Sequence, residues 1–170
     1  MRNSLLRWAL CAMAVAVVVS VLNMPALATD PVGFTSTTLG TGPFGALDVS
    51  AFFIPSKGQP WLALVKTKGK SDGYVLNNAW DVGGDTGWHT HSGPTLIIVT
   101  AGTITHYDGD DPTCTPHVYT AGMTFVDEGG GHVHIVRNEG DVPAVAYAFR
   151  LVPSGQPGRI DAPDPGNCPF

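Results

Sequence analysis

Glycine and proline interrupt this chain at short intervals, and almost no segment between them shows a helical period. The sequence holds 21 Gly and 14 Pro in 170 residues. Between them lie runs rich in Val, Ile, Thr and aromatic residues, spaced at roughly eight to twelve positions as in antiparallel sandwiches and barrels. We therefore predict an all-β protein, a small antiparallel β-barrel. The predicted strands cover residues 49–54, 61–66, 74–81, 88–91, 95–100, 102–107, 117–119, 123–126, 133–138 and 143–152.

The ends of the chain are less regular than its middle. Residues 29–48 carry Gly and Thr without clear alternation, and we place no strand there. Residues 153–170 are rich in Pro and Gly, which predicts an extended C-terminal tail. No linker divides the chain, so residues 29–170 are predicted to form a single domain, a length sufficient for a sizeable core.

The first 28 residues have the pattern of an export signal. Arg2 and Arg7 precede an apolar stretch that ends in the small-residue pattern Ala26-Leu27-Ala28. The alternative is an uncleaved membrane anchor, but the apolar stretch is short for a bilayer span. We predict a signal peptide at residues 1–28, and a secreted or periplasmic protein that has no membrane contact once this segment is removed.

The mature chain is acidic and contains two cysteines. Loss of Arg2 and Arg7 changes the formal charge from -5 to -7, a balance that argues against nucleic acid as a partner. Cys114 and Cys168 are predicted to form a disulfide in an oxidising compartment, which would hold the tail against the barrel. Two thiolate metal ligands are the alternative, weakened by the distance between the cysteines in sequence.

Four of the six histidines form two pairs, His89-Thr90-His91 and His132-Val133-His134. Side chains at positions i and i+2 of a strand leave the same face, so one strand can direct two imidazoles to one point inside a barrel. A third imidazole from a neighbouring strand would complete a site for a transition metal. The alternative places these histidines on a solvent-facing side of a strand. The repeated pairing favours the metal site.

The first pair lies in a segment that resembles the first sequence motif of the cupin superfamily. Gly83, His89, His91 and Gly102 fall at matching positions. Thr95 stands where cupins usually carry glutamate. A threonine hydroxyl is a poor metal ligand, so the usual carboxylate ligand is missing from this motif.

The second pair lies in a segment similar to the second cupin motif. Gly122, Gly131, His134 and Asn138 match it, with one extra residue before the turn and Gly129 in place of the usual proline. The resemblance implies a double-stranded β-helix, or jelly-roll, of the single-domain exported type with a conserved cupin-2 barrel.

By this resemblance the metal ligands are His89, His91 and His134, with His132 as an additional candidate. The expected cofactor is one divalent transition metal, drawn from Fe, Mn, Zn, Ni and Cu. Because Thr95 replaces the usual Glu, the site is expected to be a three-histidine centre with open positions. Its uncompensated charge would favour an anionic substrate.

The resemblance implies an exported mononuclear metal-binding cupin that acts on a small organic molecule, and it permits dioxygenase-like oxidoreductase chemistry. The alternative is a β-barrel that binds a small ligand or a metal without turnover. No residue of the sequence is clearly placed as a general acid or base. Asp127 and Glu128 are interpreted as exposed loop acids or as a proton shuttle at the pocket rim. A homodimer would cover exposed strand edges.

Overall fold

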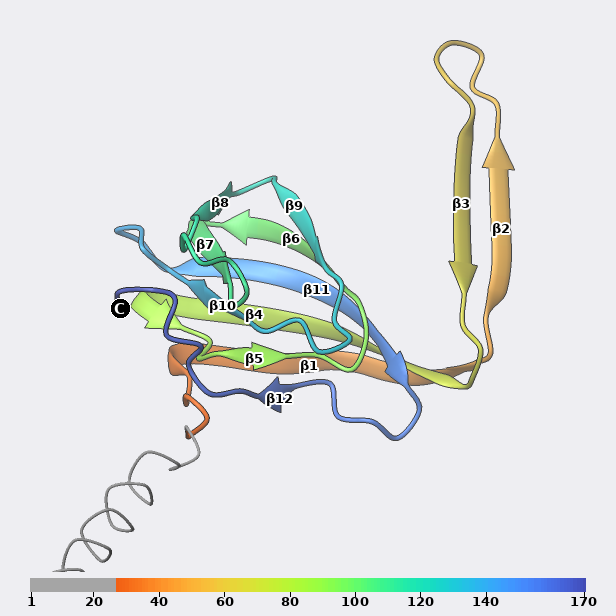
Figure 1. The fold of residues 1–170 in the computed structure, drawn as a ribbon. Helices are drawn as coiled ribbons and strands as arrows, with labels where there is room; N and C mark the ends of the chain where they lie inside the picture. The colour runs from red at the N-terminus through yellow and green to blue at the C-terminus, as the bar shows by residue number, and fades with distance from the viewer. Residues whose placement is uncertain (1–26) are drawn as a thin grey trace, which may run out of the picture.

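The structure is a computed structural model that describes residues 27–170 (Figure 1). The predicted signal peptide, residues 1–28, therefore lies outside the described residues except for its last two positions. Within residues 27–170 there is no helix long and apolar enough to cross a membrane.

Every regular element of the described chain is a strand. The strands are β1 (Val32–Gly45), β2 (Asp48–Phe53), β3 (Trp61–Lys66), β4 (Ser71–Asp85), β5 (His89–Thr90), β6 (Thr95–Ala101), β7 (Thr103–Asp108), β8 (His117–Thr120), β9 (Thr124–Asp127), β10 (His134–Arg137), β11 (Ala144–Pro153) and β12 (Ile160–Asp161). All ten predicted strands are present, with bounds within four residues of those expected.

A ten-stranded sheet curls into a nearly closed barrel (Figure 1). Its order runs β12-β5-β10-β4-β11-β6-β9, with β1 paired to β4, and with β7 and then β8 continuing from β10. The long strand β4 pairs with both β1 and β11, and its last residue, Asp85, pairs with Arg137 of β10. β4 thereby connects the two halves of the sheet. The prediction of an antiparallel double-stranded β-helix is confirmed.

Alternation along the strands sets the inner face of the barrel. In β6, the buried residues Thr95, Ile97 and Val99 alternate with exposed Leu96 and Ile98. The inward face of β11 begins with Ala144, Ala146 and Ala148 and continues with partly buried Arg150 and buried Val152. The buried hydrophobic cluster of the barrel comprises Leu76, Trp80, Ile97, Val99, Ile104, Val136, Ala144, Ala146 and Ala148.

The expectation of no regular strand in residues 29–48 was wrong. β1 pairs with β4 from Val32 to Gly45, interrupted by three register irregularities. Most β1 side chains are exposed, so burial imposed no apolar alternation on this segment. β1 is formed by backbone pairing with the long strand β4, and its side-chain pattern does not reveal this pairing.

β2 and β3 form a separate two-stranded sheet that extends away from the barrel (Figure 1). Their register runs from Asp48 opposite Lys66 to Phe53 opposite Trp61. Nearly every residue of this hairpin is exposed, including its large apolar side chains.

The C-terminal tail is fixed to the barrel, as predicted. A disulfide joins Cys114 to Cys168, with 5.2 Å between the two Cα atoms. Both cysteines pack against a second buried cluster formed by Trp88, Tyr107, Ile135 and Ala162. Between its prolines the tail also forms β12, which pairs with β5.

Candidate metal centre

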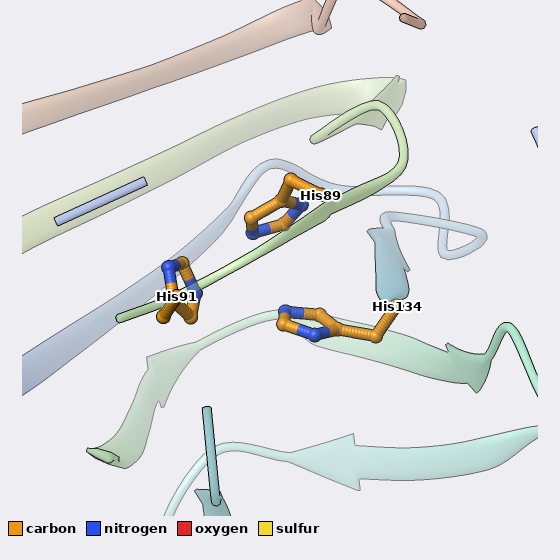
Figure 2. A group of neighbouring side chains, drawn as sticks. All are labelled: His89, His91 and His134. Atoms are coloured by element: carbon orange, nitrogen blue, oxygen red, sulfur yellow. The ribbon is translucent and has the colours of Figure 1, made fainter. Parts of the chain in front are cut away.

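Two neighbouring strands bring three histidines together. His89 of β5 lies directly opposite His134 of β10, and His91 follows β5 by one residue. The ring centroids are 4.4 Å apart for His89 and His134, 4.8 Å for His89 and His91, and 5.2 Å for His91 and His134. All three side chains are buried. Figure 2 shows the rings gathered around one space between the strands.

A backbone carbonyl orients each of the three rings. The Nδ1 atom of His89 lies 2.9 Å from the Gly87 oxygen, that of His91 lies 2.7 Å from the Gly158 oxygen, and that of His134 lies 3.4 Å from the His132 oxygen. A carbonyl only accepts, so each Nδ1 carries the proton and each Nε2 presents a lone pair. Metal-binding histidines are typically oriented by such a partner on their second nitrogen.

Burial keeps the three imidazoles neutral. It lowers the pKa of His91 to about 2, assisted by the nearby charge of Arg150. It lowers the pKa of His134 to about 4, and it holds the pKa of His89 well below the usual value. Neutral imidazole is the form that binds a metal ion.

The residues fit a single metal ion. One ring nitrogen from each of His89, His91 and His134 lies within 4.8 Å of the others, and all three are buried. Neutral imidazole nitrogen suits the late first-row divalent ions, including Zn, Cu, Ni and Fe. The ligand set is therefore compatible with the expected cofactor, and the geometry does not choose among these metals.

Thr95 is buried and bonds to an arginine. Its Oγ1 accepts a hydrogen bond of 3.0 Å from Nε of Arg150, a residue of β11. Nη2 of Arg150 also donates to Nε2 of His91 at 3.2 Å. A metal on that nitrogen would replace the second bond, while Thr95 provides a separate anchor for the guanidinium. Burial lowers the pKa of Arg150 to about 10, still far above neutrality, so the group stays charged.

Asp127 is a part of the site that sequence reasoning misplaced. It was expected at an exposed rim with Glu128, but only Glu128 is exposed and Asp127 is 5% exposed. Its Oδ2 lies 3.1 Å from Nε2 of His91 and 3.7 Å from Nε2 of His134. Burial raises the pKa of Asp127. The sequence does not show that β6 pairs with β9, and this pairing is what places Asp127 in the interior.

His132 occupies a position between the buried cluster and the surface. One of its ring nitrogens lies within 4.8 Å of ligand atoms of Asp127 and His134. Its Nε2 also lies 3.4 Å from Asp110 Oδ1 and 3.6 Å from Asp108 Oδ1. His132 therefore remains a candidate additional ligand, with acidic partners outside the centre.

The two remaining histidines lie beside this group. His106 is buried and stacks on His134, with 5.0 Å between ring centroids. Burial, with the nearby His134, lowers its pKa to about 3. His117 is more exposed, and its Nε2 lies 3.5 Å from Asp108 Oδ2. Neither residue belongs to the three-histidine cluster.

A cavity of about 270 Å³ opens onto the three histidines. Apolar side chains, including Leu76 and Ile97, form part of its wall. Arg150 and Arg159 also line it. Arg159 is paired with Asp161 at 2.6 Å, whereas among residues 27–170 no carboxylate lies within 4.0 Å of the Arg150 guanidinium. The cavity thus has an arginine available for an anion.

Residues 79–150 match the sequence profile of the Cupin domain family. This segment runs from β4 to β11 and contains all three clustered histidines together with Thr95, Asp127 and Arg150. This segment therefore belongs to the cupin superfamily. A search of curated proteins finds no significant match.

Several solved structures are similar to this chain. One is an uncharacterized conserved protein with a double-stranded β-helix domain from Klebsiella pneumoniae, with 21% identity over 53% of this chain and 74% of that chain and a TM-score of 0.43. A cupin-like protein from Thermotoga maritima shows 18% identity over 54% and 65%, with a TM-score of 0.47. An oxalate oxidase shows 25% identity over 52% and 45%, with a TM-score of 0.43. The last match spans less than half of the oxidase chain. Because these TM-scores are below 0.5, the family assignment depends on the sequence match alone.

Proposed function

We propose that this protein is an exported mononuclear metal-binding cupin that acts on a small organic molecule. The observation that carries the proposal is the cluster of His89, His91 and His134, whose Nδ1 atoms are all directed at backbone carbonyls. That arrangement leaves three neutral Nε2 donors for one divalent ion. When bound, an ion such as iron would supply dioxygenase-like oxidoreductase chemistry.

The cavity favours a small organic anion as the ligand. Its volume of about 270 Å³ limits the size of the molecule that it admits. Arg150 would bind a carboxylate beside the histidines, since its guanidinium has no carboxylate partner of its own in residues 27–170. The apolar side of the cavity would exclude water from that contact and strengthen it.

The second candidate is a β-barrel that binds a small ligand or a metal without turnover. The observation in its favour is the hydrogen bond that Arg150 donates to Nε2 of His91. This bond occupies the lone pair of one of the three imidazoles when no metal is bound. An anion could bind to this arginine in the metal-free protein. Metal content distinguishes a metal-free binder from the first candidate, and oxygen consumption with a panel of phenolic and thiol substrates distinguishes an enzyme from a metal-binding protein without turnover.

We further propose that the protein is secreted or periplasmic, consistent with the predicted signal peptide at residues 1–28 and with a single mature domain. The Cys114–Cys168 disulfide supports an oxidising compartment. Thr29, the first residue of the predicted mature chain, donates a backbone hydrogen bond to Ala162 of the tail. A homodimer remains a prediction.

Metal content after reconstitution tests the proposal. Protein purified without a histidine tag is loaded with Fe, Mn, Ni, Cu or Zn, desalted and measured by elemental analysis. We expect close to one equivalent of at least one metal, and strong loss in His91→Ala, because one of three donors is removed. His117→Ala is the matched control, since His117 lies outside the cluster and should keep its metal. Less than about a tenth of an equivalent in the wild type with all five metals would contradict the proposal.

A further inference from the structure

We propose that Asp127 is a fourth protein ligand of this centre, so that the carboxylate missing at Thr95 is supplied from the neighbouring strand. The inference rests on the proposed metal-binding function and changes the expected ligand set. In place of an open three-histidine site, it gives three imidazoles and one carboxylate.

Strand pairing explains how Asp127 reaches the position. β6 and β9 are antiparallel, and Thr95 lies directly opposite Asp127 in their register. Directly opposed residues of an antiparallel pair project from the same face, with Cβ atoms about 4.5–5.5 Å apart. Both residues are buried. A carboxylate at position 127 therefore enters the same part of the barrel interior as a side chain at position 95.

The distances suit ligands of one ion. With metal–ligand bonds of about 2.0–2.2 Å, neighbouring ligand atoms lie roughly 3.0 Å apart in octahedral geometry and about 3.4 Å apart in tetrahedral geometry. Asp127 Oδ2 lies 3.1 Å from Nε2 of His91 and 3.7 Å from Nε2 of His134. The first separation falls within this range and the second lies slightly above it. Among the described residues, the groups of ligand atoms within 4.8 Å of one another join Asp127 to His134 and not to His89, so the carboxylate has to move toward His89 to complete the coordination.

The two oxygens of Asp127 have different environments. Oδ1 accepts a 2.9 Å hydrogen bond from the backbone N–H of Gly129, which anchors the carboxylate. Oδ2 is buried and has no hydrogen-bond partner. A buried polar atom without a partner costs about 1–3 kcal/mol, more if it is charged. An unsatisfied oxygen directed at a histidine cluster is the expected geometry of a metal ligand.

Lone pairs meet at this point. Because Nδ1 of His91 donates to the Gly158 oxygen, its Nε2 directs a lone pair into the same space as Asp127 Oδ2, only 3.1 Å away. Two lone pairs at that distance repel each other unless a proton or a metal ion lies between them, and the Arg150 Nη2 that donates to the same Nε2 only partly offsets this repulsion. The other role of Asp127 is that of a counter-ion at longer range, since its charge raises the pKa of Arg150, but the guanidinium makes its direct hydrogen bonds to Thr95 and His91.

Isosteric replacement tests the assignment. Asp127→Asn keeps an oxygen for the Gly129 N–H but removes the negative charge. We expect its affinity for Mn²⁺ and Zn²⁺, measured by isothermal titration calorimetry, to fall by at least about 100-fold, the upper end of the loss seen when residues supporting a metal site are changed. Glu128→Gln is the matched control, because it makes the same charge change at the next position, on an exposed side chain. Its affinity should match that of the wild type.

Restoring the carboxylate from the other strand provides a second variant. Thr95→Glu in the Asp127→Asn background should recover at least about ten-fold of the lost affinity, because it returns a carboxylate ligand to the site. The visible absorption of the Co²⁺-loaded proteins should change in Asp127→Asn and return toward the wild-type spectrum in the double variant. If neither measurement showed recovery, this would contradict the proposal that a carboxylate at position 95 can replace the one at position 127.

A measurement on the wild-type protein avoids any dependence on variant folding. Infrared difference spectra of protein with ¹³C-labelled aspartate carboxyls should show a carboxylate shift on Zn²⁺ binding, and the absence of a shift would overturn the inference. Wild-type affinity in Asp127→Asn, together with metal loss in His91→Ala, would also overturn it and leave the proposed function standing. Failure of the wild type to bind any metal would instead contradict the proposed function.

Discussion

Carbonyl groups from three separate segments determine how the histidines act. His89 is oriented by Gly87 in the turn before its strand, and His134 by the carbonyl of His132. The carbonyl that orients His91 comes from Gly158, a distance of 67 positions along the chain. The C-terminal tail thus contributes to the candidate metal centre by fixing the tautomer of His91. At the scale of the residue, the histidines themselves and the carbonyl groups that orient their rings come from different parts of the sequence.

Arg150 yields a prediction about ligand binding. Arg150→Gln should lower the affinity for small carboxylates by roughly 10- to 100-fold, because a hydrogen bond to a charged group contributes about 1.5–3 kcal/mol. Titration of formate, acetate, glycolate and oxalate into the Co²⁺-loaded protein, followed by visible absorption, measures the effect. Arg137→Gln is the control, since Arg137 pairs with Glu139 and packs on Phe170 outside the cavity. Equal anion affinity in Arg150→Gln and the wild type would count against an anionic ligand.

Sequence patterns predict the three-histidine cluster better than they predict its surroundings. The i, i+2 spacing placed His89 and His91 together, and the cupin motif selected His134. Asp127 was placed at the pocket rim and not in the interior, because its position depends on which residue of β6 it opposes, and the loops between the strands hide that register. Arg150 lies in a strand without any motif, so nothing in the sequence connects it to Thr95.

At the scale of the element, alternation explains which strands were predicted. β6 alternates buried and exposed residues, and its period is readable from the sequence. β1 buries few side chains, so its pairing with β4 leaves no such pattern. The turn after β9 also depends on three-dimensional contact, because Gly129 passes directly over the backbone of Gly93.

The glycine turn gives a test of this element. Gly129 and Gly130 have φ of 67° and 70°, so alanine is strained by a similar amount at either position, about 1–2 kcal/mol. A Cβ at Gly129 would lie 2.4 Å from the Gly93 oxygen, whereas a Cβ at Gly130 meets nothing within 4 Å. We expect Gly129→Ala to destabilise the protein by about 1–3 kcal/mol more than Gly130→Ala, measured by urea unfolding. Equal losses would show that the close approach to Gly93 is not maintained in solution.

At the scale of the whole molecule, the nearly closed barrel surrounds the three histidines, whereas the β2–β3 hairpin is left exposed. The disulfide and the tail fasten Cys168 to the barrel, which agrees with the sequence prediction. The β2–β3 hairpin makes its backbone pairs only within itself. An isolated two-stranded hairpin is marginally stable in water, and contiguous exposed apolar side chains commonly mark an interface. The exposed residues of this kind are Val49, Phe52, Phe53, Ile54, Trp61, Leu62, Leu64 and Val65.

The predicted homodimer can be tested at this hairpin. Phe53 and Trp61 are directly opposed and exposed, so they share one face of the ribbon. If a second copy of the chain covers that face, light scattering coupled to size exclusion should give the mass of a dimer for the wild type and of a monomer for the Phe53→Ser, Trp61→Ser double variant. Val142→Ser and Val82→Ser together are the control, because those exposed residues lie away from the hairpin. A monomeric wild type at micromolar concentration would contradict the dimer. A dimer in both variants would place its interface elsewhere, because loss of two apolar side chains at a central contact should weaken association by several kcal/mol.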